Sequence, residues 1–463
     1  MNEPIPIGSR NELLLDRYLI DETDGAKLRL NRPERKEIAL RMERPWEGPG
    51  SGIYSCVFRE GDIVRMYYRA VPSLLHHDET EAQFTCYAES VDGVHWERPE
   101  LGLVEYQGST RNNIVLKGRF AHNFSPFRDT NPSCSPELPY KAIAGHHQDG
   151  LIGFASPDGL RWERIRERPL LTDGAFDSHN LAFWDENRGR YVCYSRYFHR
   201  SSPAASVYVG VRSIQSSESD DFLHWGPQRP NRYDRNAPVE HFYTNSVIPC
   251  PGAEHIYLSF PMRFMPERNK VEEFPKVGVS DNAFLSSRDG LHWDREFLEA
   301  WAPAGPDPRN WTERSHIVAR GIVETSPGEF SLYVNEHYEW DDARVRRLTL
   351  PRHRFASVRA GYGGGGFVTK PLTFEGDRLA VNLSTSAAGS VSVQVETPDG
   401  RAIPGFRFED CGWRYGDELD HIVDWGGGTA LSMLAGPPVR LRFALKDADV
   451  YAFRFERSAG AAT

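Results

Sequence analysis

The sequence lacks a long apolar run, a paired-cysteine motif and a surplus of basic residues. No stretch of its 463 residues approaches 18 consecutive apolar positions, so we expect no membrane-spanning helix. The start, Met1 to Arg10, has no basic segment followed by an apolar one, which predicts a cytoplasmic chain without a secretory signal. Asp and Glu number 65 against 55 Lys and Arg, and this net charge of −10 argues against nucleic acid as a partner.

The six cysteines are far apart and none forms a CxxC pair, which makes a zinc site improbable and predicts buried free thiols in a reducing compartment. His76-His77 and His146-His147 resemble metal-ligand pairs, but neighbouring residues on a strand point to opposite faces. We therefore expect neither a metal nor a cofactor.

Helical periodicity is weak throughout, whereas a short motif recurs four times. Its copies are Ser90–Trp96, Ser156–Trp162, Ser219–Trp225 and Ser287–Trp293, and their first residues are 66, 63 and 68 positions apart. Three copies read Ser-x-Asp-Gly-x-x-Trp, and Asp-Gly favours a tight turn between antiparallel strands. The third copy has Phe222 where the others have Gly, so we expect its turn to differ in detail.

Units of about 66 residues made of short strands predict propeller blades. Five units fit between residues 24 and 353, so we expect an all-β chain with a five-bladed β-propeller over residues 1–360. The ring would run from about Leu14 to Val358, and Leu13–Ile20 is the candidate for the strand that closes it. The glycine-rich Gly361–Gly366 marks a boundary, and residues 361–463 predict a small β-sandwich domain.

In such a ring, the starts of the first strands and the ends of the second strands lie on one face and line a central funnel. Reading the sequence at these places gives four candidate catalytic carboxylates: Asp129, Asp177, Glu240 and Glu336. It also gives candidate substrate-binding residues, which are Glu47, Arg69, Arg128, His179, Arg196, His241, Tyr243, Arg314 and His337.

This mixture of residues suits carbohydrate chemistry. Glycosidic cleavage needs one carboxylic acid to protonate the leaving oxygen and a second carboxylate to attack or to activate water. Crowding several carboxylates raises the pKa of one of them, and arginines keep the others ionised. We expect Asp177 to be the base or nucleophile, Glu240 the acid with Glu336 as its stand-in, and Asp129 to stabilise positive charge in the transition state.

The stretch Ser90–Leu116, with its Asp-Gly-x-x-Trp turn and Pro99-Glu-Leu-Gly-Leu, resembles the five-bladed propeller glycoside hydrolases of families 43, 32 and 68. Phe127-Arg128-Asp129 is similar to the Arg-Asp-Pro motif of the invertase-like members, with Thr130 in place of the proline. The resemblance implies that Asp129 stabilises the transition state. The invertase-like Asn-Asp-Pro-Asn-Gly nucleophile motif and Glu-Cys acid motif are absent.

The sequence therefore predicts a glycoside hydrolase acting on an oligosaccharide or a glycan end, such as a fructoside or an arabinoside. Its partner would be a carbohydrate, and its oligomeric state stays open. Two alternatives remain: a phosphorylase or polysaccharide lyase on the same fold, and a propeller that binds carbohydrate without cleaving it.

Overall fold

The computed structural model describes residues 3–74, 82–146, 149–199, 209–234, 236–426 and 430–458, and these are almost entirely strands and loops. The one α-helix of this part is α1, Phe408–Cys411. Short 3-10 turns occur at η3 (Arg119–His122), η4 (Pro308–Asn310) and η5 (Leu431–Leu434). The predicted all-β class is confirmed, and none of the described helices has the length and apolarity to cross a membrane.

The chain divides into two compact units, and the division differs from the predicted boundary. One unit is Pro33–Thr349, and the other combines Met1–Arg32 with Leu350–Thr463. The prediction of residues 1–360 and 361–463 was therefore wrong at both ends. The N-terminal strands pair with C-terminal ones, a long-range pairing that leaves no composition signal.

The larger unit contains three four-stranded antiparallel sheets in chain order. The first has β6 (Cys56–Glu60), β7 (Ile63–Ala70), β8 (Phe84–Ser90) and β9 (Ile114–Lys117). The second has β10 (Ser125–Arg128), β11 (Tyr140–His146), β12 (Gly150–Ser156) and β13 (Glu163–Arg164). The third has β14 (Leu181–Asp185), β15 (Arg190–His199), β16 (Val211–Ser219) and β17 (Arg229–Pro230).

The next region is divided among shorter sheets. They are β20 (Ile248–Cys250), β21 (Ala253–Ser259) and β24 (Leu285–Ser287); β19 (His241–Phe242), β22 (Met262–Met265) and β23 (Val279–Asn282); and β18 (Arg232–Tyr233) with β25 (His292–Trp293). Pro261 stands between β21 and β22. Because proline has no amide N–H to give to a sheet, it interrupts what would otherwise be one long strand.

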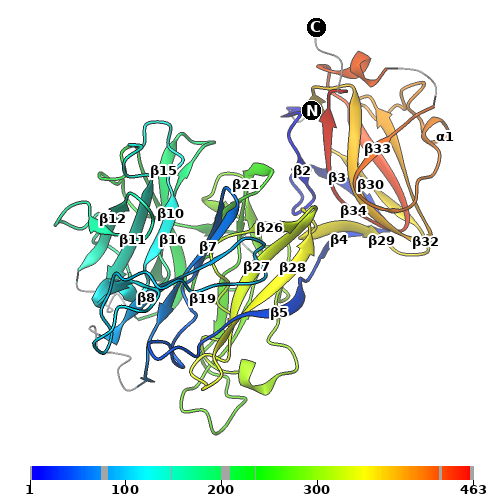
Figure 1. Cartoon of the computed structure of the whole chain (residues 1–463). Helices are drawn as coiled ribbons and strands as arrows, with labels where there is room; N and C mark the ends of the chain where they lie inside the picture. The colour runs from blue at the N-terminus through cyan, green and yellow to red at the C-terminus, as the bar shows by residue number, and fades with distance from the viewer. Residues whose placement is uncertain are drawn as a thin grey trace. The chain divides into compact units, whose positions relative to one another are not determined.

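The last sheet of this unit has β26 (Val323–Ser326), β27 (Glu329–Glu336), β28 (Arg344–Pro351) and β5 (Glu34–Arg41). Figure 1 shows β5, drawn in blue, beside the yellow β28. Leu13–Ile20 was therefore the wrong closing strand. Its leucines are fully buried in the other unit, where β2 (Glu12–Leu13) pairs with β34 (Arg440–Glu456).

The repeated motif forms a turn after the third strand of a sheet. In the first copy the carboxylate of Asp92 accepts hydrogen bonds from the backbone N–H groups of Val94 and His95, both at 2.8 Å. The copy that lacks glycine keeps the same pattern, and Phe222 takes a left-handed φ of 67°, close to the 74° of Gly93. The turn differs in one detail, as expected: the backbone N–H of Gly93 donates to the Oγ of Ser90 at 2.8 Å, and within the described residues Phe222 makes no such bond to Ser219.

These turns join neighbouring sheets through buried tyrosines. A tyrosine hydroxyl on the second strand of one sheet donates to the turn carbonyl of the following sheet: Tyr67 to Gly159 at 2.9 Å, Tyr194 to Gly290 at 2.9 Å and Tyr333 to Gly93 at 2.5 Å. Since Tyr333 lies on β27 and Gly93 follows β8, the last sheet contacts the first. We interpret the series as a closed propeller, and the count of five blades stays a prediction.

The smaller unit is built on an eight-stranded sheet. Its path is β3 (Ile20–Asp24), β30 (Gly365–Thr369), β34, β29 (Ala356–Ala360) and β4 (Ala26–Leu30), while β32 (Arg378–Glu396) pairs with both β33 (Asp417–Val423) and β34. Separately, β1 (Ile5–Gly8) runs parallel to β31 (Leu372–Phe374). Stacked rings such as Phe374 and Phe455 fill its core, and the sandwich architecture stays a prediction.

All six cysteines are free, as predicted. Five are buried, and Cys134 is half-buried.

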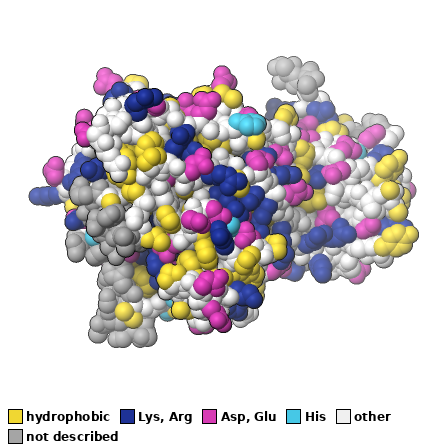
Figure 2. Space-filling model, turned by 60° about the horizontal axis from the view of Figure 1, so that its bottom comes forward, with side chains coloured by type: hydrophobic (Ala, Val, Ile, Leu, Met, Phe, Trp, Pro, Cys, Tyr) yellow, Lys and Arg dark blue, Asp and Glu magenta, His cyan; other side chains and the backbone are white. Residues whose placement is uncertain are grey.

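The surface in Figure 2 mixes Lys and Arg side chains with Asp and Glu side chains.

Candidate functional site

Four arginines from different strands of the larger unit meet around two tyrosines. We call Arg69, Arg196, Arg212 and Arg314 the arginine cluster. Arg69 lies at the end of β7, Arg196 on β15, Arg212 on β16, and Arg314 precedes β26. In an antiparallel sheet, the end of the second strand and the start of the third strand lie side by side. This arrangement places Arg69, Arg196 and Arg212 at corresponding ends of their sheets.

The two tyrosines occupy the middle of this cluster. Tyr54 precedes β6 and is buried, and its hydroxyl interacts electrostatically with Tyr243, Arg196, Arg314 and Arg69. Burial and Tyr243 raise the pKa of Tyr54 well above its usual value, so it stays a protonated hydroxyl. The guanidinium carbons of Arg196 and Arg212 lie 5.2 and 5.0 Å from the centre of the Tyr243 ring.

Three carboxylates join the arginine cluster. Asp177 forms an ion pair with Arg196. Arg314 lies 3.0 Å from a carboxylate oxygen of Glu313 and 3.3 Å from one of Glu339, and Lys276 lies 2.5 Å from Glu339. The side chain of Asp177 is 38% exposed, against 16% for Glu313 and 1% for Glu339, so Asp177 is the carboxylate a substrate reaches most readily.

Two predicted histidines lie beside these residues. His179 is fully buried, its ring centre is 5.7 Å from that of Tyr54, and its Nε2 is 3.6 Å from the Sγ of Cys56. Burial, with a smaller contribution from Arg320, lowers the pKa of His179 to about 3, and burial raises that of Cys56 to about 12, so both are neutral. His241 accepts a hydrogen bond from the backbone of Arg212 at 3.3 Å, and burial and Arg212 lower its pKa.

The structure thus brings seven of the predicted residues together. They are Arg69, Asp177, His179, Arg196, His241, Tyr243 and Arg314.

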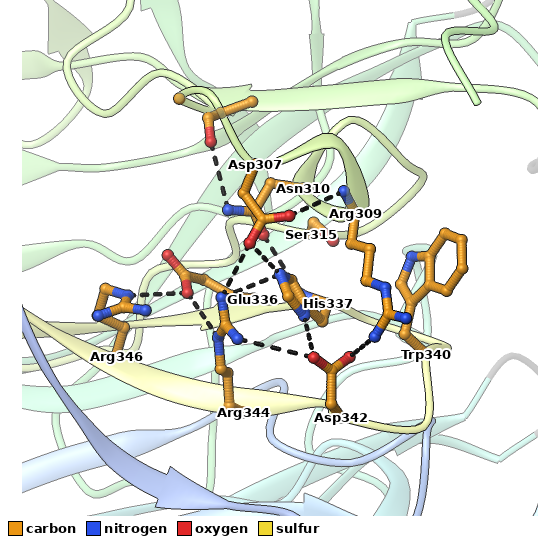
Figure 3. A network of polar contacts seen from close by, with 12 residues as sticks. Asp307, Arg309, Asn310, Ser315, Glu336, His337, Trp340, Asp342, Arg344 and Arg346 are labelled. Carbon is orange, nitrogen blue, oxygen red and sulfur yellow. Dashed lines mark hydrogen bonds and ion pairs between the residues drawn. The ribbon is translucent and has the colours of Figure 1, made fainter.

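Glu336 and His337 belong to a separate polar network at the end of β27 (Figure 3). The carboxylate of Glu336 accepts 2.8 Å hydrogen bonds from both Arg344 and Arg346. Burial acts to raise the pKa of Glu336, but Arg346 and Arg344 outweigh it and the pKa is lowered, which is unsuitable for an acid.

His337 has a left-handed φ of 56° and points between two carboxylates. Its Nε2 is 2.8 Å from Asp307 and its Nδ1 is 2.9 Å from Asp342. These contacts fix the loop that follows β27, so we interpret Glu336 and His337 as structural.

Asp129 and Arg128 were predicted at the start of a first strand, and this placement is wrong. Arg128 is the last residue of β10, and Asp129 directly follows it. Asp129 pairs with Lys141 and accepts a hydrogen bond from the Tyr191 hydroxyl at 2.8 Å. Tyr191 and Arg196 are five positions apart on β15, which corresponds to roughly 17 Å. Asp129 therefore lies far from Asp177.

Glu47 and Glu240 are each held by other side chains. Glu47 is buried, accepts a hydrogen bond from the Tyr68 hydroxyl at 2.5 Å and pairs with Arg98 at 3.0 Å. We interpret it as a structural residue. Both oxygens of Glu240 are occupied, by Arg263 at 3.1 Å and Arg295 at 2.5 Å. A carboxylate between two arginines is a poor proton donor.

The sequence analysis missed Tyr54, Arg212 and Glu339. Tyr54 lies closer to β6 than Glu47, the residue chosen for that strand start, because a loop separates them. Arg212 belongs to a third strand, and the start of a third strand lies at the same edge as the end of the second. Including third-strand starts in the search would have found it.

Of the candidate metal residues, His76, His77 and His147 lie outside the described residues. Within the described ranges, no group of three or more His, Cys, Asp or Glu side chains has a metal-binding arrangement.

No protein-family model matches the chain. One curated relative, the tubulin beta-1 chain of Geotrichum candidum, is 25% identical over 147 residues, which are 31% of this chain and 29% of that protein. The chain thus spans less than a third of this relative's length, and such a match shows no family.

Solved structures of carbohydrate-active enzymes resemble the chain in fold. One described as a glycoside hydrolase has a TM-score of 0.47 and 14% identity over 69% of this chain and 92% of that one. A fructofuranosidase from Schwanniomyces occidentalis complexed with fructosylnystose has a TM-score of 0.40 and 11% identity over 98% and 99%. A structure from the GH130 family of mannoside phosphorylases has a TM-score of 0.39 and 12% identity over 73% and 96%. Similarity at this level concerns the fold and carries no argument about the reaction.

Proposed function

We propose that the protein cleaves a glycosidic bond at the end of an oligosaccharide or glycan, and that the arginine cluster with Asp177 is the site of this reaction. The observation that carries the proposal is the meeting of Asp177, Glu313, Tyr54 and Tyr243 with four arginines, of which Arg196 and Arg212 lie on neighbouring strands of one sheet. Aromatic faces stack on sugars, arginines bind hydroxyl groups, and carboxylates perform the acid and base steps of glycoside cleavage.

The environment of Asp177 fits a base or a nucleophile. It forms an ion pair with Arg196, and its exposure leaves it accessible to a substrate. Glu313 is the next most exposed carboxylate of the group and the candidate second carboxylate. In this assignment Glu313 replaces Glu240, because both oxygens of Glu240 are bound by arginines.

The test is a screen of aryl glycosides and natural oligosaccharides with the parent and with Asp177→Asn and Glu313→Gln. We expect either substitution to lower kcat by about 100-fold or more, as for the removal of a catalytic acid or base. Asp220→Asn is the matched control, because that side chain is 88% exposed at the edge of the third sheet. Unchanged turnover in both variants would place the reaction elsewhere, and absence of cleavage products with every substrate would favour a binding protein.

A further inference from the structure

Arg69 is buried, and it forms no ion pair with a carboxylate of the described residues. It is 2% exposed, and its Nε donates to the side-chain oxygen of Gln83 at 2.9 Å. Both of its terminal nitrogens are buried, and neither has a hydrogen-bond partner among the residues that the structure describes. A buried guanidinium left in this state costs free energy, so an unpaired one at a candidate site points to a ligand.

Arg212 forms no direct ion pair with a carboxylate of the described residues, although Asp177 and Glu313 interact with it electrostatically. Its guanidinium lies 5.0–5.3 Å from the ring centres of Tyr243, Phe198 and Phe264 and contacts His241, whereas its Nε is buried and unpartnered. Burial and the neighbouring Arg196 lower the pKa of Arg212, and Tyr243, Glu313 and Asp177 offset this only in part.

A count of charges leads to the same result. Lys276 and the four arginines of the cluster supply five positive charges against the three carboxylates Asp177, Glu313 and Glu339. Among these described residues the positive charges exceed the negative ones by two, in a chain whose net charge is −10.

We propose that the arginine cluster binds an oxyanion, with Arg69 and Arg212 as the residues that contact it. Planar guanidinium groups hold carboxylate and phosphate through paired N–H···O bonds, and burial strengthens such contacts. This inference rests on the proposed function for its substrate, and it adds the chemical class: the sugar carries a carboxylate, or free phosphate enters beside a neutral sugar. In the second case a phosphate oxygen bonds to the anomeric carbon, the glycosidic C–O bond breaks, and the leaving oxygen takes up a proton.

Binding is measured without turnover, so that it is independent of the reaction. The purified full-length protein is titrated by calorimetry with glucuronate, galacturonate, glucose, galactose and inorganic phosphate at one fixed ionic strength. Fixing the ionic strength matters because salt screens non-specific attraction. We expect at least one anion to bind, and glucose and galactose to bind at least about tenfold more weakly than that anion.

Arg69→Gln and Arg212→Gln should each weaken anion binding by about tenfold or more, because a hydrogen-bonded charge pair is lost. Arg111→Gln is the control, since Arg111 is 79% exposed and pairs with Glu100. If Arg69→Gln does not fold, Arg69→Lys keeps the positive charge but removes the planar fork, and the same weakening is expected. Equal binding of anions by the parent and both cluster variants, or no anion binding at all, would overturn the proposal.

The two sources of the anion give different results. If uronates bind and phosphate does not, the anionic group belongs to the sugar. Phosphate that binds and is required for product release from neutral oligosaccharides identifies the protein as a phosphorylase. The parent could bind an anion that the variants do not bind, while no substrate is cleaved. That outcome would support the oxyanion site and refute the proposed reaction.

Discussion

Replacing Asp129 by asparagine separates a structural role from the catalytic role that its motif suggests. The carboxylate of Asp129 is completely buried. It pairs with Lys141, accepts from the Tyr191 hydroxyl at 2.8 Å and accepts from the backbone N–H of Asn131 at 3.0 Å. Asparagine has nearly the same shape, so the substitution removes the charge and little else.

The expected loss of stability follows from the charge left behind. Removing one partner of a buried ion pair costs about 3–5 kcal/mol when the other stays buried. Lys141 is 16% exposed and asparagine still offers an oxygen to Asn131, so we expect about 2–3 kcal/mol for Asp129→Asn. For a unit of this size, with an unfolding entropy of about 2.1 cal/mol/K per residue, that corresponds to a fall in Tm of roughly 3–5 °C.

The assay is urea unfolding followed by tryptophan fluorescence, together with kcat measured on the folded fraction. Lys141→Met in the same chain should restore part of the loss, because the unpaired charge is then absent. A large fall in kcat with an unchanged unfolding midpoint would refute this reasoning and return Asp129 to the catalytic group.

Three further outcomes follow from single features. Gly159→Ala should destabilise the protein by about 2 kcal/mol, measured by urea unfolding, because the residue has a φ of 77° and its new Cβ would lie 2.8 Å from the Tyr67 hydroxyl. Burial lowers the pKa of His179 and of His316 to about 3. Below pH about 6.5 the unfolded chain therefore binds more protons than the folded one. The free energy of unfolding should decrease by about 1.4 kcal/mol for each histidine per unit by which the pH is lowered below about 6.5. Unfolding curves from pH 7 to 5 check this, and His179→Gln should show a shallower dependence. Glu336→Gln should lower the urea midpoint by the equivalent of about 3 kcal/mol while leaving kcat within twofold, because its arginine partners lose a buried counter-charge.

The repeated turn was predictable because its chemistry is local. Asp92 binds the N–H groups two and three positions later, and this needs no information from elsewhere in the chain. The identity of the closing strand was not local. Leu13–Ile20 is more apolar than Glu34–Arg41, yet the latter pairs with β28, because strand choice depends on long-range pairing that an apolar pattern does not encode.

The candidate site was predictable as a set of positions but not as a set of roles. Strand ends and starts led to Arg69, Arg196 and Tyr243, which the structure brings together around Tyr54. Asp129 was assigned to the start of β10 although it follows the end of this strand, because Ser125–Arg128 contains only four residues and its two ends are close in sequence. An error of that size moves a side chain to the opposite edge of the sheet.

Arg65 and Arg69 show why the charge state of the site stays hidden in a sequence. They lie on the same strand, four positions apart, and no local feature distinguishes them. In the structure Arg65 lies 2.9 Å from a carboxylate oxygen of Glu60 and donates to the carbonyl of Asp158, a residue of the next sheet. Arg69 donates instead to the neutral amide of Gln83 and has no ion pair among the described residues. Whether a guanidinium binds a ligand or stabilises the fold depends on which groups the surrounding structure places next to it. The arginines without an ion pair could therefore be recognised only from the assembled sheets.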